Sequence, residues 1–96
     1  MSRPELQRSP YDFVTTELEI CLTFVRLIQT ELRFGWRDAA GRALESAEKG
    51  YNMIRHFLPN VENNKQRTEI ETKLNSLRRT LDFLHTDLSM FRHSPL

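Results

Sequence analysis

The chain has 96 residues, and its 14 lysines and arginines against 13 aspartates and glutamates leave a formal net charge of +1. A chain of this length fits one domain, so we expect a single helical domain over 1–96, with loose tails at 1–8 and 93–96. The balanced charge disfavours a nucleic-acid binder, because such proteins usually show a basic excess. A single cysteine excludes an internal disulfide, and no apolar run is long enough to span a membrane. A cytoplasmic location is therefore expected.

The first predicted helix covers residues 10–34. Ser9 can cap its first turn, Pro10 suits the first helical position, and Asp12 completes a capping box. Apolar residues then recur at alternating intervals of four and three, which is typical of one helix face. This stripe comprises Val14, Leu18, Cys21, Val25, Ile28 and Leu32. Gly35 can adopt the left-handed conformation common after a helix C-terminus, so the helix is expected to end there.

The second predicted helix covers residues 37–58 and has the same alternation. Its stripe comprises Ala40, Leu44, Ala47, Tyr51, Ile54 and Leu58. Gly41 and Gly50 interrupt a helix interior, where each glycine costs about 1 kcal/mol. Such glycines are expected where the backbone of a neighbouring helix comes close. Pro59 breaks the chain, and either Asn60 or Asn63 can cap the helix that follows.

The third predicted helix covers residues 62–91 and has the most regular pattern. Its stripe comprises Ile70, Leu74, Leu77, Leu81, Leu84, Leu88 and Phe91. A strict seven-residue repeat indicates left-handed packing at about +20°, as in helical bundles. The sequence therefore predicts an all-α protein, an up-down-up antiparallel three-helix bundle. The end of this long helix either overhangs the bundle and needs another chain, or folds against the region of Phe34 and Trp36.

The first helix carries more apolar surface than one core face requires. A second stripe lies beside the first and comprises Phe13, Ile20, Phe24 and Leu27. This helix is either the centre of the bundle, touching both neighbours along separate faces, or it leaves part of the second stripe open for a partner. Met53 and Phe57 on the second helix, and Phe83 and Met90 on the third, also lie off their main stripes. The candidate partner-binding residues are Phe13, Ile20, Phe24, Leu27, Phe83 and Met90.

No pattern of catalytic or metal-binding residues stands out, so we expect neither an enzyme nor a cofactor or metal site. Asp82 and His85 lie one helical turn apart, but a di-iron bundle needs a second such pair, so a surface ion pair is expected. Glu17 and Glu31 lie only on the flank of the apolar arc of the first helix. Cys21 falls within the core stripe, where cysteine behaves as a small apolar residue.

The segment from Leu27 to Ala47 resembles a tetratricopeptide (TPR) helical hairpin. Leu27, Gly35, Ala40 and Ala47 have the spacing of that repeat, although Leu44 stands where an aromatic residue is usual. The wider span from Val14 to Leu84 resembles a three-helix bundle of the microtubule-interacting-and-trafficking (MIT) type, with a Gly-x-x-x-x-Ala turn from Gly35 to Ala40 and a leucine-rich third helix. Both resemblances imply non-catalytic binding of short peptide segments in grooves between helices.

These observations predict a non-enzymatic protein–protein interaction module that holds a partner helix or peptide on an apolar groove. One alternative is a structural homodimer whose interface is formed by the spare apolar stripes of the first and third helices. A second alternative is a small nucleic-acid-binding regulator, since arginines gather around the first joint, although acidic residues are interspersed among them. No membrane or small-molecule partner is expected.

Overall fold

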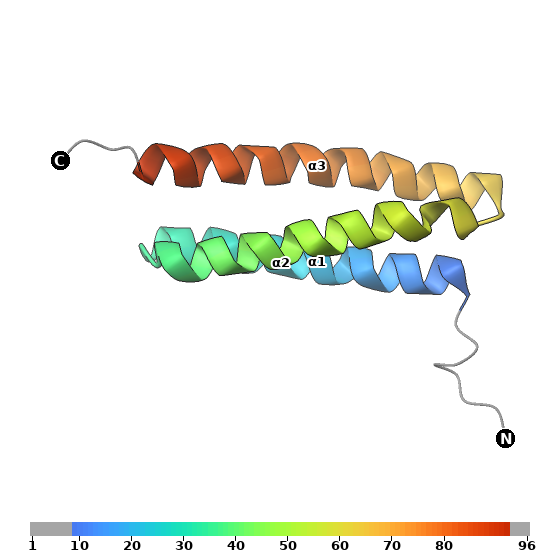
Figure 1. Cartoon of the computed structure of the whole chain (residues 1–96), viewed down its shortest axis with the longest axis horizontal. Coiled ribbons are helices and arrows are strands. Elements are labelled where there is room, and N and C mark those ends of the chain that lie inside the picture. Colours follow the sequence, from blue (N-terminus) through green and yellow to red (C-terminus); the bar gives the residue numbers. More distant parts are fainter. Residues whose placement is uncertain (1–8, 93–96) are drawn as a thin grey trace, which may run out of the picture.

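The computed structural model describes residues 9–92, apart from the side chains of residues 90–92. The chain forms helix α1 (Pro10–Arg33), helix α2 (Arg37–Phe57), a short 3-10 turn η2 (Leu58–Asn60) and helix α3 (Asn64–Arg92). Residues 9–92 contain three α-helices and no strand, which confirms the predicted all-α class. The chain runs along α1, returns along α2 and runs back along α3 (Figure 1). The predicted tails at 1–8 and 93–96 lie outside the described residues.

Both ends of α1 follow from local capping. The backbone N–H of Asp12 donates to Ser9 Oγ at 3.1 Å, as the sequence predicts for an N-cap serine. At the other end, Gly35 has φ +78°, and its N–H donates to the carbonyl of Leu32 at 3.1 Å. The N–H of Trp36 reaches back to the carbonyl of Glu31 at 2.8 Å, which completes a Schellman motif. The last helical residue is therefore Arg33, one before the predicted end.

The second joint differs from the prediction by a few residues. Leu58 begins the turn η2 instead of ending α2, because Pro59 has no N–H with which to continue the helical ladder. Asn63 caps α3, accepting a bond from the N–H of Gln66 at 2.9 Å, so α3 begins at Asn64 and not at residue 62. Val61 is 2% exposed and fills the end of the core, which holds the joint extended.

One hydrophobic core lies between the three helices. Its α1 members are the predicted residues Val14, Leu18, Cys21, Val25 and Ile28, with Leu32 partly buried beside them. Its α2 members are Ala40, Ala43, Leu44, Ala47, Tyr51 and Ile54, and its α3 members are Ile70, Leu74, Leu77, Leu81 and Leu84. Leu88 packs partly buried against the core, so the α3 stripe does not overhang the bundle as far as that residue. Phe91 and Met90 lie outside the part whose side chains are described.

The helices α1 and α2 approach each other most closely, because small residues line their contact. A Cβ atom at Gly50 would lie 2.5 Å from Sγ of Cys21, so close that one of the two groups would have to move. The Cys21 thiol also donates to the carbonyl of Ala47 at 3.6 Å. The expectation of a close neighbour at Gly50 holds, but that neighbour is the side chain of Cys21 and not a helix backbone. The expectation is wrong at Gly41, where an added Cβ would meet nothing within 4 Å.

A polar cluster fastens α3 to α2. Arg78 donates two hydrogen bonds to the Glu48 carboxylate, at 2.9 and 2.6 Å, and its guanidinium lies 4.8 Å from the ring centroid of Tyr51. Asp82 pairs with Arg78, whereas His85 approaches Glu48 at 2.7 Å. Asp82 and His85 thus have different partners and do not form the ion pair expected from their spacing. The bonds from Arg78 lower the pKa of the Glu48 carboxyl; burial opposes this effect and His85 adds to it.

Candidate protein-interaction surface

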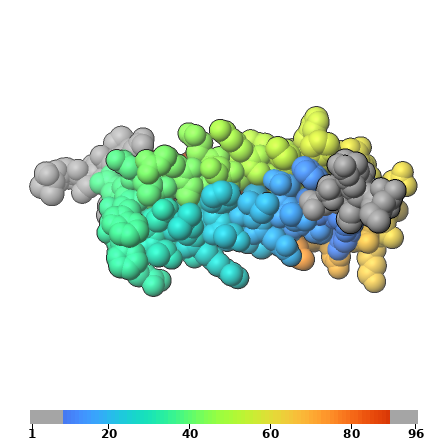
Figure 2. Space-filling model, turned by 90° about the horizontal axis from the view of Figure 1, so that it is seen from below, coloured from blue at the N-terminus to red at the C-terminus, as the bar shows by residue number. Residues whose placement is uncertain are grey.

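The face of the α1–α2 hairpin that points away from α3 carries an apolar strip, which we call the hairpin face. It comprises Phe13, Ile20, Phe24 and Leu27 from α1 with Met53 and Phe57 from α2. Phe13, Ile20 and Leu27 are seven residues apart, so they recur on one side of α1. Figure 2 looks directly at this side of the molecule, where α1 and α2 lie next to each other and hide most of α3.

The hairpin face is only partly covered within the chain. Phe13 packs edge-on against Phe57, with ring centroids 5.0 Å apart, and is half-buried. Ile20, Leu27 and Met53 each remain 43% exposed. Large aliphatic side chains of this kind gain about 1.5–3 kcal/mol when fully buried, so a partner that covered them would be favoured. The three-helix core closes without these three residues, so the fold itself does not account for large apolar side chains at their positions.

Two carboxylates interrupt the apolar row on α1. Glu17 and Glu31 lie at the positions that continue the spacing of Phe13, Ile20, Phe24 and Leu27. Both are partly buried. Oε1 of Glu31 is buried and has no hydrogen-bond partner among the described residues. Buried polar atoms normally have a partner, so this oxygen is an exception that calls for an explanation.

The outer edge of the hairpin face, on α2, is basic. Arg42 lies four positions before Ser46 on α2, and Lys49 lies four positions before Met53. Both basic residues are therefore neighbours of the hairpin face, on the side of α2 further from α1. Both side chains are exposed. The hairpin face thus has acidic groups on its α1 side and basic groups along its α2 edge.

The structure brings four of the six predicted partner-binding residues together. Phe13, Ile20, Phe24 and Leu27 all lie on the hairpin face, where Met53 and Phe57 join them. Phe83 lies apart on α3 and is 66% exposed. The side chain of Met90 is outside the described residues. The second stripe of α1 combines both sequence interpretations, because α2 covers its inner edge and leaves its outer edge open.

A second groove runs between α1 and α3. Its hollow of about 500 Å³ has Leu18, Leu22, Val25 and Leu77 on its floor, with the hydroxyls of Thr15, Thr72, Ser76 and Thr80 and the charges of Glu19 and Lys73 around it. Leu22 is 44% exposed and was missed in the sequence, since it belongs to neither stripe of α1. Its isolation from both stripes is the signal that could have identified it. This groove is lined by more polar groups than the hairpin face.

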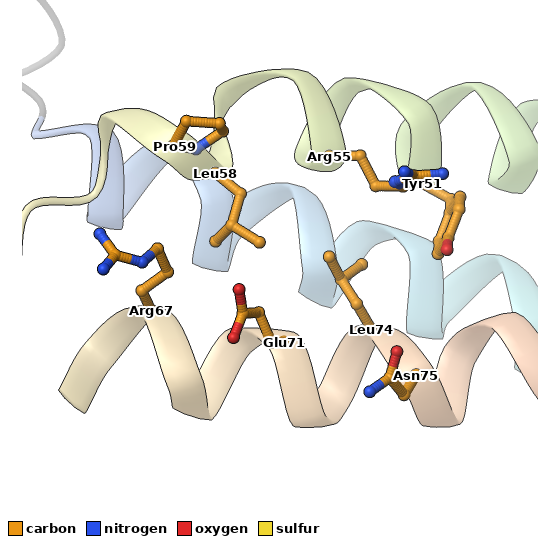
Figure 3. A pocket seen from close by; sticks show the side chains of 8 residues that line it. All are labelled: Tyr51, Arg55, Leu58, Pro59, Arg67, Glu71, Leu74 and Asn75. Carbon is orange, nitrogen blue, oxygen red and sulfur yellow. The ribbon is translucent and has the colours of Figure 1, made fainter. Parts of the chain in front are cut away.

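Another hollow, of about 820 Å³, lies near the second joint between the end of α2 and the start of α3 (Figure 3). Its polar groups are partly engaged within the chain. Arg67 donates to the carbonyl of Val61 at 2.7 Å and also bonds Oδ1 of Asn64. In Figure 3 the Glu71 carboxylate points from α3 towards Leu58. The mixture of opposite charges and few apolar side chains makes this hollow a weaker docking site than the hairpin face.

The described residues contain no group of three or more histidine, cysteine, aspartate or glutamate side chains placed to hold a metal ion. Cys21 is 1% exposed, and burial, with a smaller effect of Glu17, raises the pKa of its thiol to about 11. A thiol that is buried and protonated at neutral pH is a poor nucleophile. Within residues 9–92, no helix has both the length and the apolar character needed to cross a bilayer.

Comparison of the chain with protein families, with curated protein sequences and with solved structures found no match.

Proposed function

We propose that this protein is a non-enzymatic interaction module that docks a helix of a partner protein on the hairpin face. The single observation that carries the proposal is the second apolar row of α1, which repeats with helical spacing but stays half exposed after the core has closed. A row of this kind matches the anchor positions of an amphipathic helix lying in a groove. The resemblance to TPR and MIT-type bundles, whose members bind peptide segments between helices, points in the same direction.

The small residues between the two helices favour a helical occupant. Ser46 and Gly50 are small residues of α2 that lie beside the large apolar side chains of the hairpin face. Helices pack closely where the interface offers small side chains for the ridges of the partner to enter. An occupant covering Ile20, Leu27 and Met53 would bury the large aliphatic residues that the fold leaves open.

A homodimer through the same hairpin face is the alternative. Two copies can bury each other's exposed rows in an isologous contact. Sedimentation over a wide concentration range separates the two proposals, because a self-association that Ile20→Asp abolishes would favour the dimer.

Site-specific photo-crosslinking tests the proposal. A photo-reactive phenylalanine analogue is placed at Ile20 or Met53, in the middle of the hairpin face. We expect both positions to give adducts with the same segment of another protein, and that segment to have apolar residues at helical spacing. Adducts should disappear when Leu27→Asp puts a charge into the face. Leu27 is already 43% exposed, so this variant should stay folded, and circular dichroism checks that it does.

The matched control places the same analogue at Phe83, which is an exposed apolar residue on α3. This position should give few adducts, since it lies off the hairpin face. Equal labelling from Phe83 and Ile20, or no adducts from either hairpin position, would overturn the proposal. Adducts between two copies of this chain would replace it with the homodimer.

A further inference from the structure

The charges around the hairpin face say what kind of helix fits it. Building on the proposed function, we infer that the occupant is an amphipathic helix of another protein that carries lysine or arginine residues two heptads apart beside its apolar seam. These cations would pair with Glu17 and Glu31, the two carboxylates within the apolar row of α1. Apolar contacts then give the affinity, and the two ion pairs fix the register and the choice of partner.

The spacing of the two carboxylates suits such a helix. Glu17 and Glu31 are 14 residues apart on one helix face, which corresponds to about 21 Å along α1. A helix packed alongside with a seven-residue repeat keeps positions 14 residues apart in step with them. A single partner helix of six turns therefore reaches both carboxylates while its seam covers Ile20, Phe24 and Leu27 between them.

The state of Glu31 supports a cationic partner. Its Oε1 is buried and lacks a hydrogen-bond partner among the described residues, although its carboxylate can accept several bonds. A lysine or arginine from the occupant would pair with the part of the Glu31 side chain that remains exposed, and charge-assisted bonds of this kind are stronger than neutral ones. Neither Glu17 nor Glu31 has an ion-pair partner among the described side chains, so neither charge is neutralised there.

The same charges disfavour a contact between the α1 rows of two copies. The α1 row contains two glutamates and no lysine or arginine. If two copies met antiparallel about Phe24, Glu17 of one would lie opposite the equivalent of Glu31 in the other. If they met in parallel, each glutamate would lie opposite the same glutamate of the other copy. Like charges opposed at an apolar contact are destabilising, so a basic helix fits the α1 row better than the α1 row of a second copy does.

Three synthetic 21-residue helical peptides test the inference. They share one apolar seam and differ only at two flanking positions 14 residues apart, which hold lysine, glutamine or glutamate. Binding to the full chain is measured by fluorescence anisotropy at low and at physiological salt. We expect the lysine peptide to bind about tenfold more tightly than the glutamine peptide and the glutamate peptide more weakly still, with the difference shrinking as salt rises.

The same binding series is then measured with the charge-reversed variant Glu17→Lys with Glu31→Lys. This variant should invert the order of affinities of the three peptides. The matched control Glu19→Lys with Glu45→Lys changes the net charge equally but lies off the hairpin face, and it should preserve the order. Equal affinity for the three peptides, with binding still lost in Ile20→Asp, would overturn the charge inference and leave the proposed function intact. An unchanged order in the charge-reversed variant, or a hairpin-face dimer in sedimentation, would also overturn it.

Discussion

At the scale of single residues, Gly50 makes room on α2 for the side chain of Cys21 from α1. It costs helical stability, yet it lies where Cys21 Sγ occupies the position that a Cβ would take. The sequence indicated that a glycine inside a helix has a packing reason. It did not distinguish Gly50 from Gly41. The two glycines lie on different sides of α2, and the sequence does not show which of these sides faces α1.

Gly50→Ala should therefore destabilise the protein. Overpacking in a tight contact costs about 1–3 kcal/mol, against a gain of about 1 kcal/mol from replacing glycine in a helix. We expect a net decrease of up to about 2 kcal/mol in the free energy of unfolding, measured by denaturant titration. Adding Cys21→Ala should restore part of this loss, since it removes the clashing sulfur.

Gly41→Ala is the matched control on the same helix. Nothing lies within 4 Å of the Cβ it would add, so it should raise the free energy of unfolding by about 0.5–1 kcal/mol. If Gly50→Ala stabilised the protein as much as Gly41→Ala, the close approach of α1 and α2 at this point would be wrong.

At the scale of elements, α3 is attached to α2 by side chains instead of by close backbone contact. The Glu48 carboxylate receives both bonds from Arg78, and its side chain is only 22% exposed. Hydrogen bonds to charged groups contribute about 1.5–3 kcal/mol, and partial exposure reduces this amount. The helix-to-helix tie therefore depends on the ionised form of one carboxylate.

Glu48→Gln should lower the free energy of unfolding at neutral pH by about 1–2 kcal/mol. The pKa of Glu48 in the folded protein lies below its ordinary value of 4.5, so folding favours the ionised form. The stabilisation is complete above that value and is lost as the pH falls below it. The difference between Glu48→Gln and the unsubstituted protein should thus shrink in denaturant titrations at acidic pH.

Glu45→Gln is the control for this measurement, because Glu45 is exposed on the same helix. It should have little effect at any pH. A difference between the Glu48→Gln variant and the unsubstituted protein that stayed constant down to acidic pH would contradict the role of the Glu48 charge.

The elements themselves were largely predictable, whereas their joints were not. The stripes on α1, α2 and α3 identified nearly all the core residues, since burial on one face follows directly from helical spacing. The position of the second joint depended on which asparagine captured the free N–H groups. Asn60 and Asn63 have the same capping chemistry, and the burial of Val61, a non-local contact, favours Asn63.

At the scale of the whole molecule, the open surface depends on where the third helix lies. The sequence identified the second stripe of α1 as surplus. A periodic pattern gives the width of an apolar arc but not which side of the hairpin α3 takes, so the sequence could not place Met53 and Phe57 beside that stripe. Phe83 was grouped with the α1 residues for the same reason, and the structure separates it from them.

The contact between Cys21 and Gly50 has a practical consequence at this scale. The thiol is sealed between the two helices that form the hairpin face, so an alkylating reagent reaches it only when α1 and α2 separate. The rate of Cys21 alkylation therefore reports how readily α1 and α2 separate.

An occupant lying across both helices should lower the alkylation rate without contacting the cysteine. We expect the lysine peptide to reduce the alkylation rate, followed by mass spectrometry, in proportion to the fraction of protein bound. The glutamate peptide at the same concentration should leave the rate nearly unchanged. A rate that did not respond to a saturating ligand would mean that binding occurs without holding α1 and α2 together. The reactivity of the one cysteine of the chain thus reports whether the hairpin face is occupied.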